Sequence, residues 1–394
     1  MIGFAPTPEQ SQLQATARGF AQSEIRPLVE RTRHAKAGWD DVKPVFEAGA
    51  ALGLTKIFVP EALGGLGGSC LDAALILEEL GAADVGIASD YFSLTATMPL
   101  LLQRAGAQAE LAAFSAAPAM VLAGAQSEPN VAGSELMLAG ADPAFGPKLA
   151  AVREGEGWTL RGEKSAFITN AGVADNYLII ARTDAAQPLM GGLSLFWVPA
   201  DTPGMSVGRK TPLIGWPLTS HAALHFDDVA LPASALLGRA GGAAMLFAMV
   251  PEMPVCLAAC FVGLARAAHG YALDYAKQRR SMGAPIARAQ AVAMKLAEMH
   301  QEVTAARLMV WHAAALCETD PMQAAMVAAP AAKVRAVDAA IRCAQLCVET
   351  LGGYGVTTEY EAGRFLNDAW IGWSCDFTRD VLMLGIAAAV TGQE

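Results

Sequence analysis

The stretch WTLRGEKSAFITNAGVADNYLIIARTD, residues 158–184, holds two segments rich in β-branched and aromatic residues, separated by Asn, Gly and Asp. Such segments predict β-strands, and the residues between them predict a turn. LSLFWVPA at 193–200 and AALHFDDVALP at 222–232 continue the pattern. No segment of helical length separates the strands, which favours an antiparallel sheet over strands joined by crossover helices. Residues 119–236 are therefore predicted to form a β domain.

Both flanks of this β domain carry helical patterns. Residues 8–33 are rich in Gln, Glu, Ala and Arg, and residues 71–80 form a short helical segment that Gly81 ends. In the last third, apolar residues recur at spacings of four and three, as in Val292, Leu296, Met299, Val303, Ala306 and Val310. The sequence thus predicts an α+β architecture with helical domains at 1–118 and 237–394.

The composition and the charge of the chain limit the classes of protein to which it can belong. The 394 residues are 54% hydrophobic and 17% charged, with a formal charge of −10. Such a chain can bury a large core, and its acidic balance argues against a nucleic-acid partner. Seven cysteines, an odd number with no His to complete a metal-ligand set, suit buried thiols in a reducing compartment. No basic segment followed by an apolar one opens the chain, so we expect a cytoplasmic protein.

One carboxylate stands out in the apolar run LFAMVPEMPVCLAACFVGLA at 246–265. Glu252 is the only charged residue between Arg239 and Arg266. The run is long enough to suggest a membrane span, but this charge and the prolines at 251 and 254 argue against one. An unpaired buried carboxylate is costly. Glu252 is therefore predicted to be either a working group in a dry site or a partly exposed acid at the start of a helix, where acids are favourable.

Five stretches, taken together and in order, resemble the acyl-CoA dehydrogenase family over nearly the whole chain. They are VPEALGGLGG (59–68), QSEPNVAGSE (126–135), EKSAFITNAGVADN (163–176), YAKQRRSMGAPIARAQAV (275–292) and ETLGGYGVTTEYEAGRFLNDA (349–369). The resemblance implies an N-terminal helical domain, a middle antiparallel β domain and a C-terminal four-helix bundle. It also implies FAD between the β domain and the bundle, and a homotetramer.

The resemblance further assigns roles to single residues. Ser127 would hydrogen-bond the flavin ring, Phe167 would pack on its face and Thr169 would approach its N5/O4 edge, where a donor matters because reduction adds negative charge. Ser134 would contact the substrate. The remaining matched positions would contact the cofactor: Arg279 and Gln290 on the FAD of a neighbouring subunit, Gly352, Gly353 and Gly355 in a turn at its phosphates, Glu349 before that turn, and Thr378.

The family's reaction removes the α-proton of an acyl thioester with a carboxylate and passes the β-hydride to flavin N5. Members place this base at one of two positions. Glu252 falls at the helical position used by isovaleryl-CoA and prolyl-carrier-protein dehydrogenases, and Asp376, in SCDFT, falls at the C-terminal position. Asp376 could instead be a second acid that helps keep Glu252 protonated at rest.

The sequence thus predicts an FAD-dependent α,β-dehydrogenase of an acyl thioester, carried on CoA or on an acyl or peptidyl carrier protein. Prolines at 217 and 254, where the family commonly has Arg, indicate an unusual acyl group or carrier. The electron acceptor stays open. Two alternatives remain. In the first, Asp376 is the base, and the chemistry is like that of nitroalkane oxidases or is another reaction without desaturation. In the second, the chain is a catalytically silent subunit of a hetero-oligomer.

Overall fold

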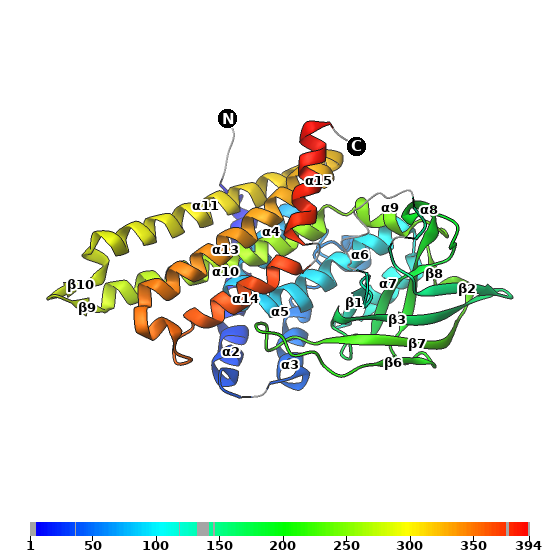
Figure 1. Ribbon diagram of the computed structural model, residues 1–394, viewed down its shortest axis with the longest axis horizontal. Coiled ribbons are helices and arrows are strands. Elements are labelled where there is room, and N and C mark those ends of the chain that lie inside the picture. Colours follow the sequence, from blue (N-terminus) through cyan, green and yellow to red (C-terminus); the bar gives the residue numbers. More distant parts are fainter. Residues whose placement is uncertain are drawn as a thin grey trace.

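A β-sheet forms one end of the molecule and long helices form the rest, with the N-terminal helices lying between them (Figure 1). The computed structural model describes residues 5–35, 37–117, 119–131, 142–144, 146–375 and 378–392. The three-part order of helices, strands and helices that the sequence predicts is confirmed.

The N-terminal part is helical because its segments carry their own start and stop signals. Ser69 caps α4 through a hydrogen bond from the Asp72 amide, and Gly106, at φ 72°, ends α6 in the left-handed conformation. The elements are α1 (Pro8–Phe20), α2 (Arg26–Thr32), α3 (Trp39–Ala51), α4 (Cys70–Ala83), α5 (Val85–Ile87), the π-helical turn η3 (Ala88–Ser93), α6 (Leu94–Ala105) and α7 (Gln108–Ala116).

The middle part is one sheet in the order β6-β7-β3-β2-β4-β5-β8, with β1 beside β4. Its strands are β1 (Leu122–Ala125), β2 (Ala150–Glu154), β3 (Gly157–Thr169), β4 (Asn176–Arg182), β5 (Leu193–Pro199), β6 (Met205–Val207), β7 (His221–Leu231) and β8 (Leu236–Leu237). The predicted antiparallel pairing holds for β3 with β7 and for β4 with β5. In contrast, β1 runs parallel to β4, and β2 touches β4 in parallel at one position.

The C-terminal part is a bundle built around α10. Pro251 stands at the N-cap of α10, which starts at Glu252, as the two prolines of that run predict. The bundle comprises α10 (Glu252–Gln278), α11 (Gln290–Thr319), α13 (Ala329–Leu351), α14 (Ala362–Ser374) and α15 (Arg379–Thr391), with the short hairpin β9 (Arg280–Ser281) and β10 (Ala284–Pro285) at its far end (Figure 1).

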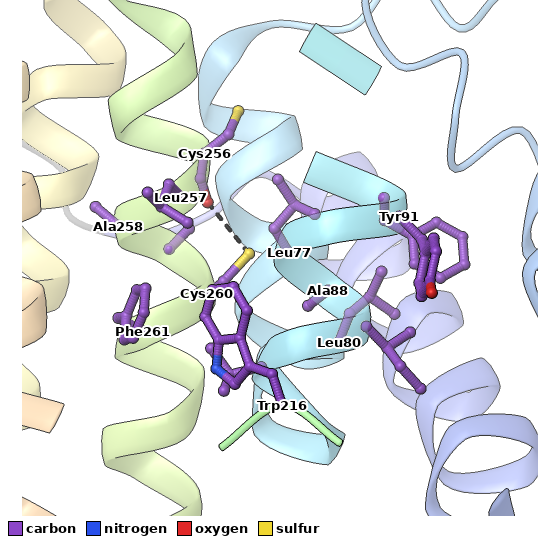
Figure 2. Close-up of a cluster of buried hydrophobic side chains, with 14 of the residues drawn as sticks. Leu77, Leu80, Ala88, Tyr91, Trp216, Cys256, Leu257, Ala258, Cys260 and Phe261 are labelled. Atoms are coloured by element: carbon purple, nitrogen blue, oxygen red, sulfur yellow. Dashed lines mark hydrogen bonds between the residues drawn. The ribbon is translucent and has the colours of Figure 1, made fainter. Parts of the chain in front are cut away.

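The N-terminal helices join the bundle by close backbone packing of α4 on α10. A Cβ at Gly81 would lie 2.2 Å from the Cys260 carbonyl oxygen, and one at Gly263 would lie 2.3 Å from the Glu78 carbonyl oxygen. Only glycine allows this approach. Figure 2 shows the buried apolar side chains at this crossing, among them Leu77 of α4 and Cys256, Leu257 and Cys260 of α10.

Two helical stretches are long and apolar enough to span a membrane by length and composition. They are Val85–Ala105 and Glu252–Gln278, and 89% and 72% of their most apolar windows are buried inside the protein. Such burial is what the central helices of a compact core show.

Candidate functional site

Glu252 lies at the first turn of α10 with only 7% of its surface exposed. Both carboxylate oxygens accept hydrogen bonds from one guanidinium: Arg104 Nη1 donates to Oε2 at 3.0 Å and Nη2 donates to Oε1 at 2.6 Å. Arg104 stands in the last turn of α6. This two-point pairing compensates for the loss of water around the carboxylate. Glu252, the isolated charge of the apolar run, is therefore paired with Arg104 of another helix.

Buried thiols surround the same carboxylate. Cys256 lies one turn after Glu252 on α10, and Cys70 of α4 and Cys317 of α11 are also buried. Hydrogen bonding to Cys256, together with burial, raises the pKa of the Cys70 thiol well above its usual value, and the charge of Glu252 adds to the effect. The thiols are therefore protonated at neutral pH. They place weakly polar groups around Glu252 and add no charge.

The residues matched to flavin contacts gather at one end of the sheet. The Ser127 and Ser165 hydroxyls lie 2.6 Å apart, and the Ser165 amide donates to the Ser127 carbonyl at 3.0 Å. The register of β3 against β7 shifts between Lys164 and Ile168, and within that irregular stretch Phe167 is 64% exposed. A large aromatic side chain left open beside two hydroxyls fits the face of a flat ring.

Thr169 ends β3 and contacts a buried imidazole. Its hydroxyl oxygen lies 3.3 Å from His221 Nε2, and His221 is the first residue of β7. The same nitrogen lies 3.4 Å from Asp90 Oδ2 on η3. Burial, with a smaller effect of Lys210, lowers the pKa of His221 to about 4. The imidazole is therefore neutral at physiological pH.

A second group of matched residues lies at the opposite end of the bundle, near β9 and β10 (Figure 1). A cavity of about 530 Å³ is lined there by Tyr275, Arg279, Ser281, Ile286, Thr350, Leu351, Gly352, Gly353, Tyr354 and Thr357. The Arg279 guanidinium lies over the Tyr354 ring, 5.6 Å from its centroid, and has no carboxylate partner among the described residues. Gly352 has φ 62°, which suits a tight turn. An unpaired cation beside such a turn fits a phosphate.

The remaining matched residues have simpler surroundings. Gln290 is exposed at the start of α11. Glu349 pairs with Lys295 at 2.7 Å, and the hydrogen bond from Lys295 lowers the pKa of that carboxyl. Thr378 stands at the N-cap of α15 without a side-chain capping bond. Ser134 and Asp376 lie outside the described residues.

Sequence reasoning missed three residues of these clusters. Arg104, Asp90 and His221 lie far along the chain from the side chains that they contact: Arg104 is 148 residues from Glu252, and His221 is 52 from Thr169. His221 and His225 share a strand, and the sequence allowed one conclusion about them: a third ligand for a metal site is absent. Nothing in the spacing indicates that a carboxylate from η3 lies beside one of them.

Comparison with known proteins identifies the framework that holds these clusters. Family models described as "Acyl-CoA dehydrogenase" match in consecutive order: the N-terminal domain at residues 7–115, the middle domain at 123–229 and the C-terminal domain at 242–391. The chain belongs to the acyl-CoA dehydrogenase family. The family resemblance and the fold class predicted from sequence are thus confirmed.

Full-length members of the acyl-CoA dehydrogenase family align with almost the whole chain. The short-chain specific acyl-CoA dehydrogenase of Megasphaera elsdenii is 31% identical, covering 99% of this chain and 100% of that protein. The human mitochondrial short-chain enzyme is 32% identical, covering 97% and 90%. The solved butyryl-CoA dehydrogenase of M. elsdenii superimposes with a TM-score of 0.89 at 30% identity, covering 99% and 100%.

This acyl-CoA dehydrogenase family member is an oxidoreductase, and FAD is its cofactor. The structure titled "FAD complex of PigA" has the same fold, with a TM-score of 0.88 at 24% identity. The exposed Phe167 beside two hydroxyls, and the cation beside a glycine turn, are suitable for the ring and the phosphates of FAD respectively. The residues present therefore fit the cofactor.

Proposed function

We propose that the protein catalyses the α,β-dehydrogenation of an acyl thioester and that Glu252 accepts the α-proton. The observation that carries this proposal is a buried carboxylate at the first turn of α10, held in one orientation by Arg104. The acyl group is a short or branched chain on CoA or on an acyl or peptidyl carrier protein. The structure titled "Prolyl Acyl Carrier Protein Oxidase AnaB" shares the fold at 20% identity, with a TM-score of 0.86.

When bound, FAD supplies the acceptor for the electron pair that leaves with the β-hydrogen. The chain's own residues would hold the reacting groups in place. Phe167 would cover the ring face, and the hydroxyls of Ser127 and Thr169 would donate to the ring edge that gains negative charge. Buried thiols and apolar side chains of α4, α10 and α11 exclude water from Glu252. Ser134 is the proposed substrate contact.

Arg104 has two opposing effects on Glu252 as a base. The guanidinium holds the carboxylate in one direction, so the group is oriented to take a proton. However, both oxygens already accept hydrogen bonds from Arg104, and one of these bonds has to weaken as the proton arrives. Arg104 thereby ties proton removal to a small movement at the end of α6.

Asp376 remains the alternative base, as the C-terminal acid that sequence reasoning identified. It directly follows Cys375 in the sequence. With Asp376 as base, chemistry like that of nitroalkane oxidases stays open. Comparison of Glu252 and Asp376 variants decides between the two assignments.

Two copies of the chain are needed for a complete cofactor site in this proposal. The ring-binding cluster lies near Trp216, whose ring is 6.1 Å from that of Phe261. Arg279 follows Phe261 by 18 residues along α10, about 27 Å at 1.5 Å per residue. Arg279, Gln290, Gly352 and Gly353 would therefore contact the FAD of a neighbouring copy. The proposal therefore includes a homotetramer, as the family resemblance implies, in the cytoplasm.

The test is anaerobic bleaching of the bound flavin by a panel of CoA-linked and carrier-linked acyl thioesters. With Glu252 as base, Glu252→Gln slows bleaching by about 10²–10⁴-fold while FAD content is unchanged, and Asp376→Asn bleaches normally. Normal bleaching in Glu252→Gln and loss in Asp376→Asn would assign the base to Asp376. A product lighter by two hydrogens supports dehydrogenation, whereas nitrite release from a nitroalkane supports the oxidase.

A further inference from the structure

One buried lysine contacts both neighbours of Ser127 along the chain. Lys164 lies in β3, and none of its side chain is exposed to solvent. Its Nζ donates to the Gln126 backbone carbonyl at 3.2 Å and to Glu128 Oε1 at 2.9 Å. Ser127 itself is half-buried. The residue proposed to bind the flavin ring therefore stands between two residues that share one ammonium group.

Backbone amides hold the Glu128 carboxylate from its other side. Glu128 Oε2 accepts from the Lys148 amide at 2.6 Å, and Oε1 accepts from the Leu149 amide at 2.9 Å. The Glu128 amide also donates to the Val131 carbonyl at 2.9 Å, and the Val131 amide donates to the Glu128 carbonyl at 3.1 Å, which closes a turn. Three donors thus bind the buried carboxylate, which compensates for the loss of water and fixes the direction in which it faces Lys164.

Lys164 also stands at the start of the irregular stretch of β3 that carries the other ring-binding residues. The register of β3 against β7 shifts between Lys164 and Ile168. Ser165 and the exposed Phe167 lie in this stretch, and the Ser165 amide donates to the Ser127 carbonyl at 3.0 Å. One lysine thus joins the loop that carries Ser127 to the part of β3 that carries Phe167.

We propose that Lys164 and Glu128 are positioning residues that hold the Ser127 hydroxyl against the flavin ring and thereby raise the reduction potential of bound FAD. The inference rests on the proposed placement of Ser127 at the ring. Lys164 and Glu128 act by fixing the backbone on both sides of Ser127, without contacting the cofactor. A hydroxyl held in one place stabilises the negative charge that reduction adds to the ring, because the donor does not have to reorganise.

The chemistry of this pair favours a role in positioning over one in stability alone. Burial lowers the pKa of Lys164, and the carboxylate of Glu128 opposes that effect. A buried ion pair gains little net stability, and well-packed apolar residues in its place are often neutral or stabilising. An apolar side chain could fill the volume of Lys164, but it could not bind the Gln126 carbonyl. What the lysine adds is therefore a fixed geometry for the residue between its two acceptors.

The experiment is a double-mutant cycle on the midpoint potential of bound FAD, with the visible spectrum as a second readout. Lys164→Met keeps the length of the side chain and removes both of its hydrogen bonds. We expect it to lower the potential, by no more than Ser127→Ala does. In a Ser127→Ala background, Lys164→Met should leave the potential unchanged, because no hydroxyl remains to be positioned.

Two further variants separate positioning from stability. If Lys164→Met does not fold, because Glu128 is left buried without its cation, Lys164→Met combined with Glu128→Gln removes both charges. The combined variant still lacks the bond to the Gln126 carbonyl, so the same Ser127-dependent loss of potential is expected. Leu28→Ala is the control: Leu28 of α2 is fully buried, so its truncation should lower the unfolding free energy and leave the potential unchanged.

The results that contradict the proposal can be told apart. An equal shift by Lys164→Met with and without the Ser127 hydroxyl would overturn it, because the lysine would then act on the flavin by another route. An unchanged potential in the folded Lys164 variants, when Ser127→Ala lowers it, would also overturn it, and so would an equal shift in Leu28→Ala. An unchanged potential and spectrum in Ser127→Ala would instead overturn the placement of Ser127 in the proposed function, and this inference with it.

Discussion

At the start of α10, one guanidinium binds both oxygens of a carboxylate in an otherwise apolar run. The Arg104 side chain keeps 27% of its surface exposed and that of Glu252 only 10%. The guanidinium can therefore stay partly hydrated while the carboxylate cannot. Glu252 consequently depends on Arg104 more than Arg104 depends on Glu252.

Replacing Arg104 is expected to destabilise the protein and to slow flavin bleaching. Arg104→Gln should cost about 3 kcal/mol of unfolding free energy, because the carboxylate stays buried without its partner. Bleaching should also slow, because Glu252 loses the two hydrogen bonds that orient it. Urea unfolding and the rate of flavin bleaching measure the two effects.

Two further variants serve as controls for this pair. Arg104→Lys keeps the charge but loses the two-point geometry, so it should be intermediate in both measurements. Arg104→Gln combined with Glu252→Gln should cost less than the two single changes added together. A loss below about 0.5 kcal/mol in Arg104→Gln, the range of ordinary surface changes, would show that the pair contributes little to stability.

Asp368 gives a second test, through pH. Its Oδ1 accepts from the Trp216 amide, and its Oδ2 lies 3.3 Å from Arg364 Nε. Burial raises its pKa from 3.8 to about 6. The folded state therefore binds this proton more tightly than the unfolded state does. The stability that this provides is full below about pH 4 and is lost as pH rises through about 6.

Asp368→Asn cannot titrate, so its unfolding free energy should vary less between pH 4 and pH 6 than that of the parent protein. Urea unfolding at several pH values in this window provides the measurement. Parallel stability curves for the two proteins would show that Asp368 does not titrate in this range.

At the scale of elements, the crossing of α4 and α10 holds the site together. Gly263 of α10 faces α4, where an added Cβ would lie 2.3 Å from the Glu78 carbonyl oxygen and 2.6 Å from the Ala82 amide nitrogen. Both atoms belong to the α4 backbone, so they cannot move away by a side-chain rotation. On the same helix, a Cβ at Gly270 would have no atom within 4 Å.

These two glycines make a matched pair of variants. Gly263→Ala should destabilise the protein by about 1–3 kcal/mol or more, because the helices have to separate. Gly270→Ala should stabilise it by about 0.5–1 kcal/mol, because alanine is the better helix former. Thermal and urea unfolding compare both variants with the parent. Equal effects of the two changes would contradict close packing at this crossing.

At the scale of the whole molecule, the two groups of cofactor residues lie far apart: one lies where the sheet meets α10, and the other lies beside β9 and β10 at the far end of the bundle (Figure 1). We expect Arg279→Glu to weaken FAD binding, because a carboxylate replaces the cation beside the Gly352–Gly353 turn. A variant that damages the ring-binding cluster, such as Phe167→Asp, should weaken it independently.

Mixing the two variant chains tests the proposed sharing between copies. Each mixed pair would contain one site with an intact ring cluster from one copy and an intact Arg279 from the other. Co-expression should therefore recover FAD, measured by absorbance, at one of the two sites in each mixed pair. No recovery in co-purified mixed oligomers would place both groups in the same copy's site.

Short-range patterns in the sequence were sufficient for the architecture. Strands between 158 and 231 follow from β-forming segments that turn residues separate, and the start of α10 follows from Pro251. The parallel pairing of β1 with β4 could not be predicted, because it depends on where the chain returns after the β2–β3 hairpin.

The sequence by itself determined the order of the three parts, the family and the identity of the isolated carboxylate, because each depends on neighbours within a few turns or strands. Only the tertiary structure decided what that carboxylate contacts, which nitrogen of His221 faces an acid, and that Arg279 lies far from Thr169. Arg104 meets Glu252 across 148 residues of chain, His221 meets Thr169 across 52, and Asp90 reaches His221 from a separate element. Such contacts depend on how whole helices and the sheet pack, which local spacing does not encode.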